Sequence, residues 1–264
     1  MRRLLLFAVC WLLLAAAGCA EAPAPEKITD FSKWLWRNYE SADNDALANA
    51  IVQLNGTVTE VTADKPLKAL ITRLDQSDVT LVGLKGEAKL AVGLLAVTES
   101  ACTLAQVEKI HTSGDPGAVH PDAYKAYKRT FVQSRDDYLA HKLVRLDWDT
   151  ELTSNYATEK LKGGVRFVAD AGKVKSPFGA ALVSRTFLKE PAVGSDSSTT
   201  WPQDYQIEAY YERSPGKVVH LFAVWRQADF SGLSTESSFL QNIQMGGFVD
   251  WDKEMEKACK SGKF

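Results

Sequence analysis

The sequence predicts an α+β protein, in which a curved antiparallel sheet of about six to seven strands packs against a C-terminal helix, with extra helices at the N-terminus. Three patterns predict this class. Apolar residues recur at helical spacing before residue 86, strand periodicity dominates residues 129–227, and apolar residues recur every four positions from 243 to 259. A content of 45% hydrophobic and 24% charged residues is typical of a globular chain.

Residues 1–18 have the layout of a secretory signal peptide. Arg2 and Arg3 give a positive start, and Leu4–Ala17 is an apolar run that is too short to cross a bilayer. Small residues then precede Cys19, where cleavage would expose a new N-terminus.

The residues before Cys19 refine this interpretation. Ala16, Ala17 and Gly18 resemble the lipobox of bacterial lipoproteins, although the commonest first residue there is Leu and this chain has Ala16. The resemblance implies cleavage before Cys19, diacylation of its thiol and acylation of its new amino group by chains such as palmitate. Two or more acyl chains give stable membrane anchoring. Ala20, in place of Asp, implies the outer membrane, and we expect the body to face the periplasm. Ordinary cleavage after Ala20 is the alternative.

The net charge argues against a nucleic-acid partner. Loss of Arg2 and Arg3 with the signal leaves 29 basic against 33 acidic residues, a net charge of about −4 with histidine neutral. No basic stripe is present to neutralise phosphates. No later segment is apolar and long enough to predict a transmembrane helix.

Residues 19–27 contain two prolines and are predicted to form a short tether, and residues 28–86 are predicted to form an N-terminal helical layer. Trp34, Trp36 and Tyr39 either pack in a helix-on-helix core, the more frequent use of such a stripe, or dip into lipid headgroups. The helices are predicted from the spacing of Phe31, Trp34, Leu35 and Tyr39, of Leu47, Ala50, Ile51 and Leu54, and of Leu67, Leu70, Ile71 and Leu74.

Residues 87–264 are predicted to form one α+β domain. Its first element is a buried strand, and the capping box of Thr103 and Gln106 marks the start of the next helix. A hairpin joins residues 205–213 to 217–227 through a Pro-Gly turn, and an even-length loop there pairs Tyr211 with His220. The other predicted elements are strands over 89–98, 129–134, 144–152, 165–169 and 180–188, a short helix over 123–127 and a long loop over 189–204.

The last predicted element is a long helix with a kink or break at Gly246-Gly247. Its apolar face is marked by residues that recur every four positions, namely Ile243, Gly247, Trp251, Met255 and Cys259.

Cysteine usage predicts a disulfide. Cys10 leaves with the signal and Cys19 carries lipid, so Cys102 and Cys259 remain as an even pair in an oxidising compartment. A bond between them closes a loop of roughly 150 residues and contributes on the order of 5 kcal/mol in the chain-entropy model. Two buried free thiols are the alternative.

From residue 89 the order of elements is strand, helix, short helix, six strands and long helix. This order resembles the helix-grip fold of the START-like (SRPBCC) superfamily, in which a curved antiparallel sheet grips a long C-terminal helix over an apolar cavity. In that fold the first helices cradle the end of the last helix, which implies that Cys102 and Cys259 come within disulfide reach. The Gly246-Gly247 break and the N-terminal helices depart from the family pattern, and a generic sheet-plus-helix domain is the alternative.

No pattern indicates a catalytic, metal or cofactor site. The sequence has no nucleophile elbow, P-loop, dinucleotide fingerprint, H-E-x-x-H pair or EF-hand loop, and its four histidines lack metal-ligand spacing. His220 is interpreted as a core histidine bonded to a tyrosine hydroxyl, with a catalytic base as the alternative. Arg185 and Arg226 either grip an anionic headgroup or form structural ion pairs. The residues predicted to line a ligand cavity are Trp148, Arg185, Tyr211, His220, Phe222 and Arg226.

The leading functional hypothesis is a membrane-anchored envelope lipoprotein that binds an apolar or amphipathic ligand between the sheet and the C-terminal helix. The alternative is a structural or adaptor lipoprotein that docks a protein partner and holds no small molecule, and an exposed apolar patch on the N-terminal helices would favour it. An enzyme is the third hypothesis. A cleft that holds a carboxylate and a histidine within hydrogen-bond reach would favour that one.

Overall fold

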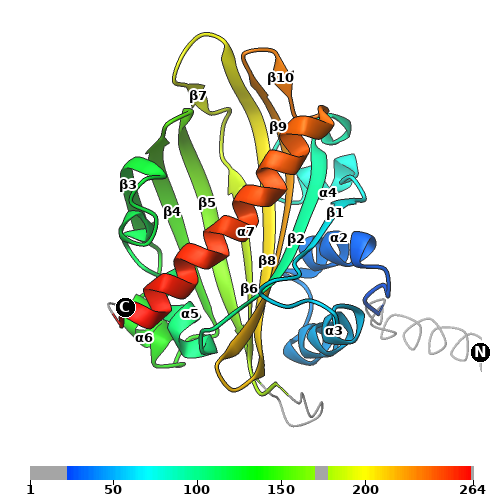
Figure 1. Cartoon of the computed structure of the whole chain (residues 1–264), viewed down its shortest axis with the longest axis vertical. Helices are drawn as coiled ribbons and strands as arrows, with labels where there is room; N and C mark the ends of the chain where they lie inside the picture. The colour runs from blue at the N-terminus through cyan, green and yellow to red at the C-terminus, as the bar shows by residue number, and fades with distance from the viewer. Residues whose placement is uncertain (1–22, 170–177, 263–264) are drawn as a thin grey trace, which may run out of the picture.

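The computed structural model describes residues 23–169 and 178–262, so the predicted signal peptide and Cys19 lie outside the described residues. The chain forms three layers (Figure 1). A long C-terminal helix crosses one face of an antiparallel sheet, and the N-terminal helices pack against the other face. This arrangement confirms the predicted α+β class. The sheet has ten strands, which is more than the six to seven expected.

The strands follow the order β1-β2-β9-β8-β6-β5-β4-β3 across the sheet, with β10 beside β9 and β7 beside β5. All of these pairings are antiparallel. The helices are α2 (Ile28–Asn38), α3 (Asn44–Thr57), α4 (Gln76–Thr80), α5 (Leu104–His111), α6 (Arg135–Leu139) and α7 (Ser238–Ser261), with short 3-10 turns η1 (Ala88–Leu90) and η2 (Pro116–Ala118). The strands are β1 (Leu67–Ile71), β2 (Val92–Ser100), β3 (Tyr124–Phe131), β4 (Arg145–Ser154), β5 (Ala157–Val168), β6 (Ala181–Leu188), β7 (Val193–Gly194), β8 (Thr199–Ser214), β9 (Lys217–Phe230) and β10 (Leu233–Ser234).

Two of the predicted helices are wrong, because both segments pair as strands at the edges of the sheet. The helix expected to begin at Pro66 is strand β1, whose Leu67 pairs with Val97 of β2. Leu70, which would face the helical core, is 53% exposed. The short helix expected over 123–127 belongs instead to β3, which pairs with β4. In both cases the backbone hydrogen bonds of a neighbouring strand override a weak local pattern.

The β8–β9 hairpin contains a bulge that the sequence did not reveal. Ser214 pairs with Lys217 across the turn, but the next pair is Glu212 with Val218. Arg213 is therefore an extra residue on β8. Relative to the predicted pairing, this shifts the register by one residue, so the β8 side chains before Arg213 in the sequence point to the opposite face of the sheet.

The bulge is fixed by the end of α3, because Arg213 Nη2 donates to the Val58 carbonyl oxygen at 2.8 Å. The predicted pairing of Tyr211 with His220 is consequently wrong, and His220 pairs with Tyr210. Tyr211 lies on the side of the N-terminal helices, in the core that they share with the sheet.

Helix α7 continues through Gly246-Gly247, so the predicted break is absent (Figure 1). A Cβ atom at either glycine would meet no heavy atom within 4 Å. The two glycines therefore leave open space on the helix surface and do not interrupt its hydrogen bonding.

The aromatic stripe of α2 packs into a core that α2 shares with α3, as expected, and also with the sheet. Trp36 is fully buried, and its indole lies edge-on to Phe187, Tyr205 and Trp225, with ring centroids 5.7 to 6.4 Å apart. Trp34 is 8% exposed and Tyr39 is 1% exposed, so this stripe does not present an aromatic surface to lipid headgroups.

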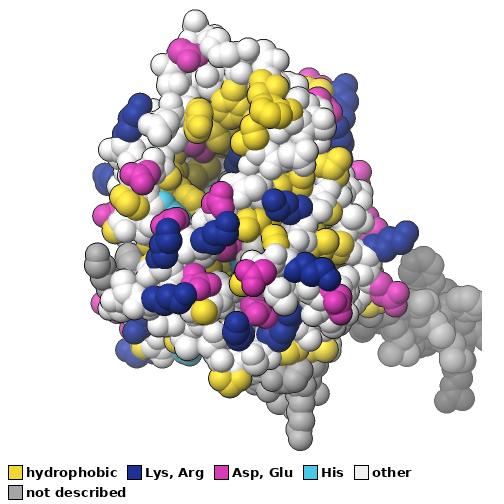
Figure 2. All heavy atoms as spheres, in the orientation of Figure 1, with side chains coloured by type: hydrophobic (Ala, Val, Ile, Leu, Met, Phe, Trp, Pro, Cys, Tyr) yellow, Lys and Arg dark blue, Asp and Glu magenta, His cyan; other side chains and the backbone are white. Residues whose placement is uncertain are grey.

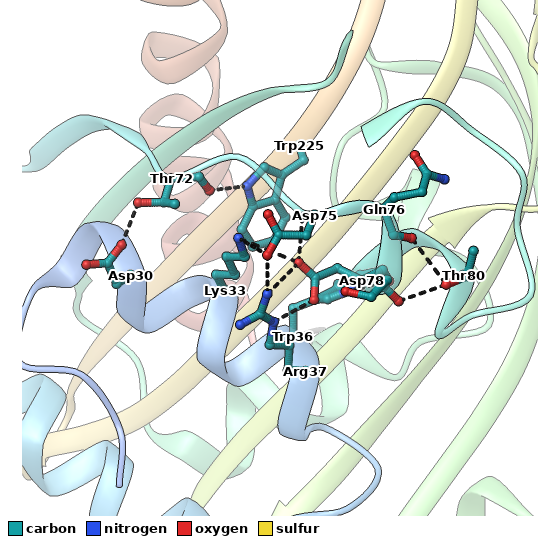
Figure 3. A network of polar contacts seen from close by, with 11 residues as sticks. Asp30, Lys33, Trp36, Arg37, Thr72, Asp75, Gln76, Asp78, Thr80 and Trp225 are labelled. Carbon is teal, nitrogen blue, oxygen red and sulfur yellow. Dashed lines mark hydrogen bonds and ion pairs between the residues drawn. The ribbon is translucent and has the colours of Figure 1, made fainter. Parts of the chain in front are cut away.

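A network of charges joins α2 to α4 (Figure 3). The Asp78 carboxylate accepts from Arg37 Nε at 2.5 Å and lies 3.7 Å from Lys33 Nζ, while Lys33 also lies 3.0 Å from Asp75. Asp78 is buried, and its backbone carbonyl oxygen accepts from the Trp36 indole at 3.0 Å. A buried carboxylate with two cationic partners therefore joins α2 to the segment that precedes β2.

The predicted disulfide is present between Cys102 and Cys259, with Cα atoms 5.7 Å apart. The predicted capping box of Thr103 and Gln106 is also formed. The Gln106 side-chain amide in addition donates to the Cys259 carbonyl oxygen at 3.1 Å. The start of α5 and the end of α7 are thus joined by one covalent and one polar contact.

Asp78→Ala should destabilise the fold by about 2–3 kcal/mol, because it leaves Lys33 and Arg37 with one exposed partner next to an apolar core. Urea unfolding of the purified protein measures this loss. Glu60→Ala is the matched control, because it removes one partner of an exposed ion pair with Lys65 and should cost under ~1 kcal/mol. Equal losses in the two variants would contradict a structural role for the network.

The double variant Cys102→Ser/Cys259→Ser should lose about 2–5 kcal/mol of unfolding free energy, because the unfolded chain is no longer cross-linked. Reductant should lower the stability of the wild type to that of the variant and leave the variant unchanged. Urea unfolding with and without reductant measures both free energies. A wild type whose stability does not change with reductant would contradict the expectation.

Candidate functional site: a cavity between the sheet and α7

A cavity of about 560 Å³ lies between the sheet and α7. Figure 2 shows this face hollowed beside α7, with hydrophobic side chains inside the hollow and at its rim. The walls come from β3, β4, β5, β8, β9, the η2 turn and α7. Apolar side chains dominate the walls, among them Leu152, Leu161, Phe222 and Phe248.

Helix α7 supplies one wall through the stripe that predicted it. Ile243, Gly247, Trp251 and Met255 all line the cavity, because residues four apart lie on one side of a helix. The Trp251 ring stacks on His120, which follows η2. Contacts between α7 and the segment before β3 therefore close this side of the cavity.

One polar group in the cavity is centred on Arg226 of β9. Its Nε donates to Asp204 of β8, which is fully buried, and its guanidinium lies 4.4 Å above the centroid of the Trp201 ring. The other Asp204 oxygen accepts from the Gln206 side chain at 2.6 Å. Arg226 was expected either to grip an anionic headgroup or to form a structural ion pair. The ion pair is formed, and Arg226 also lines the cavity.

Glu159 of β5 faces the same part of the cavity. It is 7% exposed, and within the described part of the chain no hydrogen bond or ion pair satisfies its carboxylate. Burial raises the pKa of Glu159 to about 7, and the nearby charge of Asp204 adds to this effect while Arg226 opposes it.

A second polar group surrounds Glu208 of β8. Its Oε2 accepts from the Tyr210 hydroxyl and lies 3.2 Å from His220 Nε2. Burial lowers the pKa of His111 to about 4, so His111 is neutral at pH 7. Burial also opposes ionisation of Glu208, but the charge of His111, which is protonated at the low pH where Glu208 titrates, lowers the pKa of Glu208 to about 2, together with the hydrogen bond and charge of His220 and the hydrogen bond of Tyr210.

His220 lies behind this group, held between two carboxylates. Its Nδ1 is 2.7 Å from Asp252 Oδ1 on α7, and Asp252 also accepts from the Thr98 hydroxyl. Burial alone would lower the pKa of His220, but the charge and hydrogen bond of Asp252, followed by those of Glu208, raise it to about 9.

At pH 7 His220 is therefore a cation that donates both N–H groups. A carboxylate and a histidine do lie within hydrogen-bond reach, which is the arrangement that would favour an enzyme. However, His220 is 1% exposed and has no lone pair with which to accept a proton. The arrangement instead joins Asp252 of α7 to Glu208 in the sheet.

Arg129 of β3 is a further polar residue of the cavity wall. Its guanidinium donates to the His111 carbonyl oxygen at 2.6 Å and to the Tyr127 hydroxyl at 3.1 Å, and it stacks 4.3 Å from the centroid of the Trp148 ring. These contacts hold the guanidinium flat against the wall.

Three of the six residues predicted to line a ligand cavity do line it, namely Trp148, Phe222 and Arg226. His220 is buried one layer behind the wall. Arg185 and Tyr211 are on the opposite face of the sheet. There Arg185 pairs with Glu40 and lies 4.5 Å above the centroid of the Tyr39 ring.

Several polar residues of the cavity were not predicted, and Glu159 is the clearest example. It alternates with Ala157 and Leu161 on the buried face of β5, between the exposed Thr158 and Lys160. The alternation of apolar and polar residues over 157–163 could have placed Glu159 on the buried face. However, the strand was expected to begin only after Gly163-Gly164.

Among the described residues, no three or more His, Cys, Asp or Glu side chains are grouped so as to hold a metal ion. The described helices include none that is both long and apolar enough to cross a membrane.

No family model and no curated protein matches this chain. Solved structures that resemble it include the lipid transfer and protein localization domain of human StarD13, with 12% identity over 72% of this chain and 84% of that one and a TM-score of 0.40. Human STARD10 has 8% identity over 73% and 82%, with a TM-score of 0.41. A STAR-related lipid transfer protein from Xanthomonas axonopodis has 10% identity over 74% and 97%, with a TM-score of 0.39. At this level of similarity none of them informs the function of this chain.

The His220 cluster predicts a pH dependence of stability. The folded pKa of about 9 lies above the unfolded value near 6.5, so the stabilisation is complete below pH ~6.5 and is lost as the pH rises toward 9. The unfolding free energy should fall over this range with a slope approaching about 1.4 kcal/mol per pH unit from this group.

His220→Gln should be less stable at pH 7 and should lack this slope, whereas His141→Gln, at a side chain that is 46% exposed, should retain it. Urea unfolding at several pH values tests the expectation. A His220→Gln profile parallel to that of the wild type would show that His220 is not charged in the folded protein.

Proposed function

We propose that this protein binds an apolar or amphipathic ligand in the cavity between the sheet and α7. The observation that carries the proposal is the cavity itself. Its volume of about 560 Å³ lies within the ~300–1,000 Å³ typical of ligand pockets, and its walls are mostly apolar with a few fixed polar groups. Ligand pockets are mostly apolar clefts or cavities that a few fixed polar groups orient, and this space has that character.

The proposal extends to where the protein acts. The lipobox-like residues before Cys19 support lipidation there, and we propose that the acyl chains anchor the protein in the outer membrane on its periplasmic side. The short tether of residues 19–27 would then keep the folded body close to the membrane surface. An apolar ligand that partitions into the bilayer would thereby be available to the cavity at high local concentration.

The adaptor hypothesis has less support. It called for an exposed apolar patch on the N-terminal helices. Within the described α2 and α3 no large hydrophobic side chain is exposed, and within residues 28–86 the exposed ones are Leu70 of β1 and Leu81 at the end of α4. Tyr156 and Ile243, which are 59% and 52% exposed, instead border the cavity.

Two measurements test the proposal. Solvent extraction of the purified protein followed by mass spectrometry should release an apolar or amphipathic molecule. A fluorescent fatty probe should bind the emptied protein, and Gly247→Leu should weaken this binding at least tenfold. Leucine at position 247 adds a side chain at the cavity wall, and it also favours the helix over glycine.

Gly246→Leu is the matched control. A Cβ atom at Gly246 also meets open space, but residue 246 does not line the cavity, so probe affinity should stay at the wild-type value. The proposal fails if extraction yields nothing and the probe does not bind, or if the two leucine variants behave alike.

A further inference from the structure

We infer that the ligand is an amphipathic amine, whose ammonium group pairs with the Glu159 carboxylate while its hydrocarbon part fills the apolar cavity. This inference deepens the proposed function and rests on it. It names the chemical class of the ligand and the residue that selects it.

The first observation is the state of the Glu159 side chain. A carboxylate that is 7% exposed normally has a hydrogen-bond donor or a cation as a partner, because burying an unpaired charge costs several kcal/mol. Within the described residues Glu159 has neither, and it borders the cavity. Its neighbours Leu152, across the strand pair, and Leu161, two residues along β5, supply no polar atom.

The second observation is that the nearest cation is already used. Arg226 donates to Asp204, whose other oxygen accepts from Gln206. The positive charge of Arg226 is therefore balanced by Asp204, and the carboxylate of Glu159 remains as an excess acid at this end of the cavity. Elsewhere in the cavity, the protonated His220 pairs with Glu208 and Asp252, and the Arg129 guanidinium is bound by backbone carbonyl oxygens and by the Tyr127 hydroxyl.

The charge balance favours a cationic headgroup over the other two classes of amphiphile. A carboxylate or phosphate headgroup would meet the like charge of Glu159 and could reach Arg226 only in competition with Asp204. An alcohol could donate one hydrogen bond to Glu159 but would leave its charge uncompensated. An ammonium group supplies both the donors and the charge.

The groups that face Glu159 also predict how amine binding depends on pH. They are Asp204 on β8, Arg226 on β9 and Tyr124 on β3, and the buried carboxyl has a pKa of about 7 in the empty cavity. An ammonium ligand needs the ionised carboxylate, so its binding should be about tenfold weaker at pH 6 than at pH 8. An alkylammonium group, with a pKa near that of lysine, stays charged throughout this range.

Displacement of the fatty probe from the purified full-length protein tests the inference with three ligands of one chain length, namely dodecylamine, dodecanol and dodecanoate. At pH 8 dodecylamine should bind at least tenfold more tightly than either of the others. Glu159→Gln, which is nearly isosteric, should remove this preference and its pH dependence while dodecanol still binds, which shows that the variant is folded. Glu151→Gln, at an exposed position of β4, should leave both unchanged.

The possible outcomes separate the inference from the proposed function. If dodecanol and dodecylamine bind equally, or if dodecanoate binds most tightly, the cavity binds ligands but the inference is wrong. It is also wrong if the amine preference survives in Glu159→Gln. If none of the three displaces the probe and the probe itself does not bind, the proposed function fails as well.

Discussion

The position of α7 is the constraint on which the rest of this structure depends. The helix is attached near its end by the disulfide to α5, and in its middle by Asp252, which meets His220 of the sheet. Closer to its start, Met245, Phe248 and Val249 pack on apolar residues of β2 and β9. These attachments hold α7 against one half of the sheet. The cavity is the space that remains between α7 and the strands β3, β4, β5, β8 and β9.

The two faces of the sheet differ in how their side chains are packed. On the face of the N-terminal helices, Trp36 and its aromatic neighbours fill the space between the layers, and the charge network of Asp78 seals the edge. On the face of α7, buried ionised groups lie among apolar side chains of the cavity wall. Such groups are tolerated because nearly all have a partner of opposite charge, and Glu159 is the exception.

The sequence predicted the features that depend on neighbouring residues in the chain. The capping box, the alternating strand β4 and the four-residue stripe of α7 are local patterns, and the disulfide followed from simple elimination among four cysteines. The sequence could not predict which side chains of β8 point toward α7. That direction depends on the bulge at Arg213, and the bulge depends on a carbonyl group at the end of α3, far away in the sequence. For the same reason Tyr211 was placed in the cavity, whereas the structure places Glu208 and Tyr210 there.

The sheet order has a consequence for how the chain reaches this structure. Strand β9 lies between its hairpin partner β8 and the distant strand β2, so the sheet is continuous only after residues 217–230 have been inserted between these two parts. Pairing over such long sequence separations forms slowly, because loop closure must precede most of the stabilising contacts. The sheet that covers the N-terminal helices is therefore completed only when nearly the whole polypeptide is available. Until then the apolar faces of these helices stay uncovered. During that interval the unfinished edges of β2 and β8 are the part of the molecule most open to mispairing with another copy.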